Sequence, residues 1–132
     1  MQNQDWDNIL HLLAIAVLAD RRVRDLELIE FCHEAQRICR AYYPQQIMPC
    51  ADLRDWFLAQ QDALKAKLSS DNANSVILNA VHNIPEGPLR ATILQAIFSI
   101  SICDHDLDDE ESALVDVCQR EWNIPLPDLE LA

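Results

Sequence analysis

The sequence predicts an all-α fold of about six helices in one domain. Glycine occurs only once, at Gly87, so the chain offers few positions for the positive backbone angles that short β-hairpins need. Leu, Ala, Gln, Glu and Asp dominate, runs of β-branched residues are scarce, and this composition favours helices. The 132 residues are half apolar, which is enough for a substantial single core.

An internal repeat is the third observation, and it organises the rest of the chain. Each copy has an apolar helical stretch, an Asp, an aliphatic residue three positions on and a Glu seven positions on. The matching residues are Asp20, Val23 and Glu27 in the first copy and Asp104, Leu107 and Glu111 in the second. All three pairs have the same separation along the chain, which indicates a duplication.

The first copy predicts a helical hairpin. A helix over 5–19 is apolar nearly all round from Ile9 onward and should be central, with His11 as a hydrogen-bonded or partly exposed core histidine. A second helix over 25–42 has one apolar stripe, and His33 lies off it and should be solvated. The stripe consists of Leu28, Phe31, Cys32, Ala35, Ile38, Cys39 and Tyr42.

The middle of the chain predicts two further helices. Pro44 and Pro49 mark a connection over 44–50, and a helix over 51–68 follows. Residues 69–72, Ser-Ser-Asp-Asn, end that helix and start a short one over 73–83. The expected inward residues of the longer helix are Leu53, Trp56, Phe57, Gln60, Leu64 and Leu68. Those of the short helix are Val76, Ile77, Ala80 and Val81, followed by Ile84.

The second copy predicts the second hairpin. Pro88 suits the first turn of a helix over 88–103, again apolar nearly all round, and a last helix covers 109–122. Its inward residues are Leu114, Val115, Cys118 and Trp122. We expect one domain over 1–124 and a non-helical tail over 125–132. The two central helices should lie side by side, with the duplicated hairpins related by a pseudo-twofold.

The charge balance restricts the partners. Twenty-two acidic and ten basic residues give a net charge of −12, which makes nucleic acid and anionic membrane surfaces poor partners. Metal cations, a basic protein surface or a membrane-associated complex suit it better, although such a charge also simply keeps a protein soluble. No apolar run approaches the ~20 residues of a membrane span, and the acidic N-terminus is unlike a signal peptide, so we expect a cytoplasmic protein.

The five cysteines do not form a recognisable framework. Their number is odd and no Cys-x-x-Cys pair occurs, which argues against structural zinc and a secreted disulfide scaffold. Most of them fall at helical core spacing, so we expect buried free thiols.

The second acidic turn could bind a cation. Asp104, Asp106 and Asp108 are followed by Asp109, Glu110 and Glu111. These crowded carboxylates repel one another, and a hard divalent ion such as Ca²⁺ or Mg²⁺ would relieve the repulsion. An EF-hand is rejected, because its glycine position holds Asp109 and its bidentate glutamate position holds Val115. The first copy supplies Asp20, Asp25 and Glu27, a weaker set of ligands.

Helix capping is the alternative for part of this set. Asp108 and Glu111 have the spacing of a capping box. Asp20 and Asp104 end their helices, where a carboxylate opposes the helix dipole, so they need either the backbone amides of the next turn or a metal.

Both turns resemble a known signature. Residues 19–27, Ala-Asp-Arg-Arg-Val-Arg-Asp-Leu-Glu, and 103–111, Cys-Asp-His-Asp-Leu-Asp-Asp-Glu-Glu, are similar to the repeated Ala-Asp-Gly-x-[Val/Ile]-x-x-x-Glu of the TerB-like family of tellurite-resistance proteins and DjlA-type co-chaperone domains. The resemblance implies an all-helical pseudo-twofold domain, a divalent cation site and a role in bacterial stress response or complex assembly rather than catalysis. The family's glycine is replaced by Arg21 and His105, so we expect both turns to differ in shape.

Three classes of function remain open. The first is a non-enzymatic interaction module, which the acidic surface, the repeat and the resemblance favour. The second is a small enzyme or metal-dependent protein, for which Cys103 beside His105 and a single Glu30-x-x-His33 spacing are the only candidates. The third is a structural homodimer anchored by Trp6, Trp56 and Trp122, although core packing is the more common use of tryptophan.

Overall fold

The fold is all-α, as the sequence predicts. The computed structural model describes residues 4–18, 25–46, 48–84, 87–102 and 109–124, and no β-strand occurs in these ranges. The helices are α1 (Gln4–Leu18), α2 (Asp25–Tyr42), α3 (Cys50–Leu68), α4 (Ala73–His82), α5 (Pro88–Ile102) and α6 (Asp109–Trp122), with a 3₁₀ turn at Pro44–Gln46. These bounds agree with the predicted ranges to within one residue. The tail over 125–132 lies outside the described residues, so the domain division stays a prediction.

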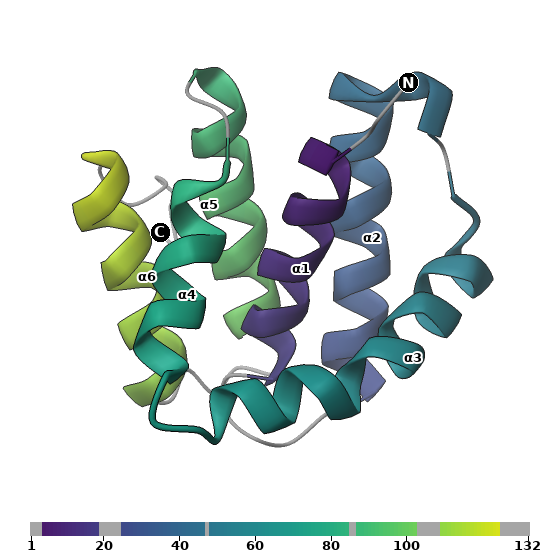
Figure 1. The fold of residues 1–132 in the computed structure, drawn as a ribbon. Helices are drawn as coiled ribbons and strands as arrows, with labels where there is room; N and C mark the ends of the chain where they lie inside the picture. Colours follow the sequence, from purple (N-terminus) through teal and green to yellow (C-terminus); the bar gives the residue numbers. More distant parts are fainter. Residues whose placement is uncertain (1–3, 19–24, 47, 85–86, 103–108, 125–132) are drawn as a thin grey trace.

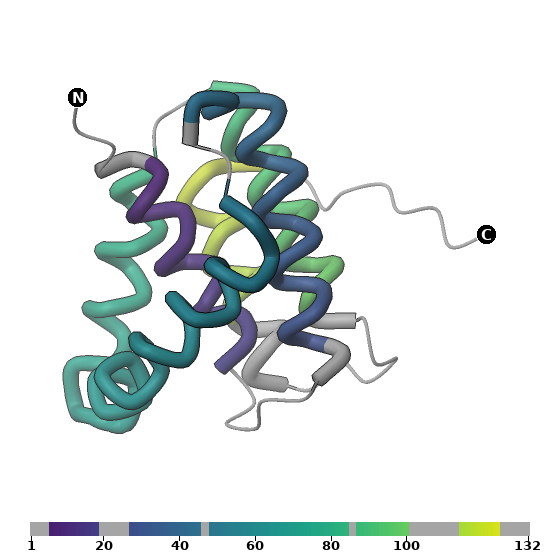
Figure 2. The backbone as a smooth tube through the Cα atoms, turned by 90° about the vertical axis from the view of Figure 1, so that its right-hand side faces the viewer, coloured from purple at the N-terminus to yellow at the C-terminus, as the bar shows by residue number. Residues whose placement is uncertain are grey.

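The two apolar helices lie together in the middle of the molecule. α1 packs against α5, α2 packs on both of them, and α6 packs on α5 and α4 (Figure 1). α3 crosses the lower end of the bundle obliquely and contacts α1, α2 and α4 (Figure 2). The predicted side-by-side placement of the two central helices is therefore confirmed. The pseudo-twofold relation between the hairpins stays a prediction.

The central position of α1 follows from its sequence. Every residue from Ile9 to Leu18 is buried except His11, which has an intermediate exposure. The His11 ring donates through Nδ1 to the Asp7 carbonyl oxygen at 2.8 Å and packs edge-on against Trp56, so it is the hydrogen-bonded core histidine that was expected. Burying a Leu, Ile or Val side chain contributes about 1.5–3 kcal/mol, so this helix and α5 supply much of the stability.

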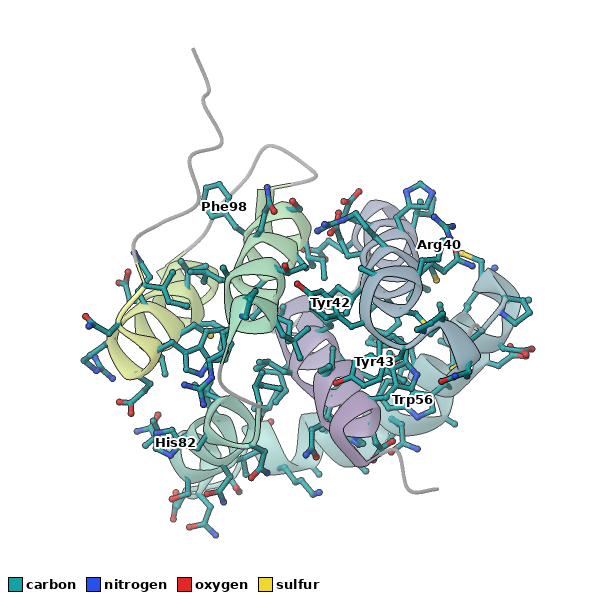
Figure 3. All side chains as sticks on the ribbon, turned by 90° about the horizontal axis from the view of Figure 1, so that it is seen from above. Arg40, Tyr42, Tyr43, Trp56, His82 and Phe98 are labelled. Carbon is teal, nitrogen blue, oxygen red and sulfur yellow. The ribbon has the colours of Figure 1, made fainter. Side chains whose placement is uncertain are left out.

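An aromatic cluster joins α2 to α3. Phe31, fully buried on α2, lies 5.5 Å from the Phe57 ring and 6.3 Å from the Trp56 ring, measured between centroids. Trp56 is only half-buried and lies on α3 (Figure 3). The stripe on α2 is confirmed for six of its seven residues. Tyr42 is the exception, because it is exposed and its hydroxyl bonds the Thr92 hydroxyl on α5 at 3.2 Å.

The connection between α2 and α3 is held against α2. Gln36 donates through Nε2 to the Met48 carbonyl at 3.1 Å, and the Cys39 thiol donates to the Tyr43 carbonyl at 3.2 Å. The Tyr43 ring also packs against Trp6, with 5.7 Å between centroids. These contacts fix where α3 begins relative to α2, and thereby position the pocket between the two helices.

α4 is attached to α6 and α5 through the buried Trp122. Its indole Nε1 donates to the Val81 carbonyl at 3.0 Å, and the Arg90 guanidinium lies 5.6 Å from its ring centroid. Arg90 also donates to the Ile84 carbonyl at 2.7 and 3.1 Å, which satisfies a carbonyl just after α4. On the outer side His82 bonds Glu121 at 2.7 Å and holds the pKa of that carboxyl below its usual range (Figure 3).

Two chain reversals use positive backbone angles. Gly87, just before α5, has φ of +125°, a conformation that side chains with a Cβ rarely adopt. Asn123 follows α6 with φ of +54°, and the Ile124 amide donates to the Gln119 carbonyl at 3.2 Å. That geometry is a Schellman-type helix end, with Asn in the position that glycine usually takes.

Candidate functional site

The structure describes only part of the predicted cation site. Asp20, Asp104, Asp106 and Asp108 lie outside the described residues. Glu111 lies in the first turn of α6, and its side chain is also outside the description. Glu27, in the first turn of α2, is the predicted ligand whose side chain the structure describes.

The helix ends that flank the two acidic segments lie at the same end of the molecule. α1 ends and α2 begins there, and so do α5 and α6 respectively, at the lower end in Figures 1 and 2. The four helix ends that flank the two acidic segments therefore lie on the same side of the bundle, whereas the segments themselves lie outside the described residues.

Glu27 is fully buried at that end, with 0% of its surface exposed. A buried carboxylate is costly unless charged or hydrogen-bonding groups compensate it. The start of α2 provides one source of compensation, since the helix dipole favours negative charge in its first turn. The buried Glu27 carboxyl thus lies in the first turn of α2, three residues along the chain from the segment 19–24.

Two further glutamates follow along α2 and interact with each other. Glu34 is 9% exposed and accepts a hydrogen bond from Nε of Arg37 at 3.0 Å, with a second contact from the same guanidinium. Glu30, one turn earlier, is hydrogen-bonded to Glu34. Burial first, and then the neighbouring Glu34, raise the pKa of Glu30 to about 7, whereas Arg37 opposes the shift. Glu30 can therefore hold or release a proton near neutral pH.

Metal binding by the described side chains alone is not indicated. Within the described ranges, no group of three or more His, Cys, Asp or Glu side chains is arranged to hold a metal ion. His33 is exposed, as predicted, whereas Glu30 is half-buried beside Glu34. The isolated Glu30-x-x-His33 spacing thus lacks the further ligands that a di-iron carboxylate site needs.

A pocket of about 490 Å³ lies between α2 and the start of α3. It is lined by Leu28, Ile29, Cys32, Cys50, Ala51 and Arg54. The Cys32 thiol donates to the Cys50 carbonyl at 3.6 Å. Burial first, and then the adjacent Cys50, raise the pKa of the Cys32 thiol to about 12. Cys32 is buried and Cys50 is exposed, so the two cysteines that line the pocket differ in their access to solvent.

Sequence reasoning missed both of these arrangements. The Glu30–Glu34 pair had a readable signal, because two carboxylates four residues apart on a helix must be neighbours. No pattern in the sequence predicts that Cys32 and Cys50 lie close together, since this depends on the path of the chain between α2 and α3. The expectation that most of the cysteines are buried free thiols is confirmed for Cys32, Cys39 and Cys118, whereas Cys50 is exposed.

Comparisons with family models, with curated proteins and with solved structures returned no match. No helix in the part of the chain that the structure describes is both long and apolar enough to cross a bilayer.

Proposed function

We propose that this chain is a non-catalytic helical interaction module of the TerB-like type, acting in bacterial stress response or complex assembly, and that a divalent cation regulates it. The cation, Ca²⁺ or Mg²⁺, would bind at the acidic turns. Its ligands would come from Asp20, Glu27, Asp104, Asp106, Asp108 and Glu111. The observation that carries the proposal is the full burial of the Glu27 carboxylate in the first turn of α2, at the end of the molecule where the helix ends that flank both acidic segments lie.

A cation at this end would join the two hairpins. Carboxylates gathered at one site repel one another, and a hard cation with oxygen ligands relieves that repulsion. Because α1 and α5 pack together and end there, one ion could draw ligands from both copies of the repeat. Binding would then stabilise the folded domain and fix the shape of the acidic surface.

The partner we propose is a protein with a basic surface, either in the cytoplasm or in a membrane-associated complex. The net charge of −12 favours association with positively charged surfaces and speeds their encounter. The same charge disfavours nucleic acid. A bound cation would neutralise part of the acidic end and so change the affinity for such a partner.

The proposal is tested by thermal unfolding with EDTA and then with Ca²⁺, Mg²⁺, Mn²⁺ or Zn²⁺ in excess. A ligand at a hundredfold excess over its Kd adds about 2.7 kcal/mol to the free energy of unfolding, which for a chain of this size is about 8 °C in Tm. We expect such a rise with Ca²⁺ or Mg²⁺. Equal melting temperatures in EDTA and in every cation would overturn the proposal.

Three variants locate the effect. Asp104→Asn and Glu27→Gln should each remove most of the rise in Tm. Asp62→Asn, which neutralises an exposed carboxylate on α3, changes the net charge equally and should retain it. A rise that all three variants keep would place the cation elsewhere and contradict the proposed ligand set.

A further inference from the structure

Cys32 and Cys50 meet where α2 and α3 diverge. The Cys32 Sγ lies 3.6 Å from the Cys50 carbonyl oxygen, which is only two bonds from the Cα that bears the Cys50 side chain. Both residues line the same pocket, and Cys50 is the first residue of α3. A disulfide requires two cysteines with neighbouring backbones, and this arrangement brings them together without any sequence motif.

We propose that Cys32 and Cys50 form a redox-modification site, at which an anionic low-molecular-weight disulfide of the glutathione class converts the two thiols into a disulfide between α2 and α3. The inference is independent of the cation proposal, since none of its residues belongs to the acidic turns. It rests on the contact between the Cys32 sulfur and the Cys50 backbone carbonyl, on the unequal exposure of the two cysteines and on the chemistry of the pocket beside them.

The reaction needs two exchange steps. The exposed Cys50 loses its proton to solvent and its thiolate attacks one sulfur of the reagent; the reagent's S–S bond breaks, a mixed disulfide forms on Cys50, and one thiolate leaves. Cys32 then loses its proton and attacks the Cys50 sulfur, which releases the second thiolate. The two protein thiols are oxidised by two electrons in total, and one reagent disulfide is reduced to two thiols.

The environment assigns the order of these steps. Cys50 is accessible, whereas Cys32 is buried and its thiol pKa is raised, so the reagent meets Cys50 first. The first step leaves a mixed disulfide beside a pocket of about 490 Å³. This volume is within the usual range of small-molecule sites, about 300–1,000 Å³. Cys32 then attacks from the pocket wall and completes the exchange.

Arg54 explains the preference for an anionic reagent. It lies one turn after Cys50 on α3 and lines the pocket. The chain as a whole carries a net charge of −12 and repels anions, so a guanidinium beside the reactive thiol gives local attraction for a carboxylate-bearing reagent. A neutral disulfide gains nothing from that charge.

The product would close a covalent loop over residues 32–50. Such a link restricts the unfolded chain and so raises the melting temperature, provided that the native geometry accommodates the bond. It would also fix the start of α3 to α2, on the side of the molecule that holds the aromatic cluster. Oxidation thereby changes the rigidity of the α2–α3 interface without altering the acidic turns.

The test treats the full chain, first reduced, with oxidised glutathione and follows intact mass and free thiols. The wild type should lose two of its five thiols, and a peptide map should give one cross-linked peptide joining Cys32 to Cys50. Cys32→Ala should stop at the mixed disulfide on Cys50. Cys50→Ser should lose no thiol from this pair, and Cys118→Ser, a buried cysteine on α6, should still form the cross-link.

The role of Arg54 is tested with two reagents on the wild type and on Arg54→Gln. The variant should react about threefold more slowly with oxidised glutathione, the effect of one unit charge a few ångströms away in water, and equally fast with neutral hydroxyethyl disulfide. A wild type that keeps all five thiols, or a cross-link that joins other cysteines, would overturn the proposal. Equal rates for both chains with both reagents would overturn the assignment of Arg54.

Discussion

Replacing Glu30 by Gln should make the protein more stable above neutral pH and leave it nearly unchanged in acid. In the folded chain the pKa of Glu30 is about 7 instead of the ordinary 4.5. The main cause is burial of the carboxyl, and the second is the neighbouring Glu34. The folded state therefore binds this proton more tightly than the unfolded state does. The stabilisation is complete below the ordinary pKa and is lost as the pH rises through about 7.

The size of the effect follows from the shift. A rise from 4.5 to about 7 corresponds at full weight to about 3 kcal/mol, because one pKa unit is about 1.4 kcal/mol. Glu30 is only half-buried, so solvent screening reduces the expected contribution to the free energy of unfolding to about 1 kcal/mol. Gln cannot ionise, and its amide can donate to Glu34 as the protonated acid does, so the variant should avoid this cost.

The assay is urea unfolding of wild type and Glu30→Gln at several pH values from about 4 to about 9, which span the ordinary and the raised pKa. The variant's excess free energy of unfolding should grow from near zero to about 1 kcal/mol across that range. Asp62→Asn, an exposed carboxylate on α3, serves as the control and should show no such growth. A difference between Glu30→Gln and wild type that stays constant with pH, or that falls as pH rises, would refute the reasoning.

Three other predictions follow from packing and exposure. Phe31→Ala should lower the free energy of unfolding by about 3–5 kcal/mol in urea, because the ring is fully buried, whereas Leu58→Ala, at an exposed site, should change it by less than about 0.5 kcal/mol; comparable losses would contradict the packing. Trp122→Phe should cost about 1–3 kcal/mol, since it leaves the buried Val81 carbonyl with only the longer bond from the Ile84 amide at 3.4 Å, and an unchanged urea midpoint would argue against the indole bond. Iodoacetamide should label Cys50 well before the three buried thiols in a peptide map, and equal labelling would show that Cys50 is not exposed.

The sequence was most informative where local physics decides the structure. Pro88 begins α5 because proline suits a first helical turn, and the two nearly all-apolar helices became the centre because they leave few polar groups for solvent. Residues 69–72 separate α3 from α4 as expected. The Asn72 side chain makes no capping hydrogen bond to α4; instead, the Ser70 hydroxyl accepts a hydrogen bond from the Asn72 amide at 3.2 Å.

The errors come from features that periodicity does not encode. Tyr42 falls on the apolar stripe of α2, yet it is the last residue of the helix and its hydroxyl reaches Thr92 at an exposed position. An apolar stripe predicts which face of a helix is buried. It does not predict how far along the helix a neighbouring helix covers that face. Cys50 was expected to lie in the connection over 44–50, and it is instead the first residue of α3, at an exposed position.

The candidate site could be predicted only in outline. The repeat located Glu27 at the start of a helix, but its burial depends on how the central helices pack. The raised pKa of Glu30 likewise requires knowing which face of α2 is covered. The pocket between α2 and α3 arises from the path of the chain over 44–49, and no local pattern determines that path.

The most direct test of the central claim is isothermal titration calorimetry of the metal-free chain with Ca²⁺ and with Mg²⁺. The account predicts saturable heat with a whole-number stoichiometry, abolished in the double variant Asp20→Asn/Asp104→Asn and retained in Asp62→Asn. The affinity should depend on pH, and binding should release protons at low pH, because carboxylate ligands must be deprotonated. Absence of saturable binding with either ion, or full binding by the double variant, would contradict a cation-regulated module.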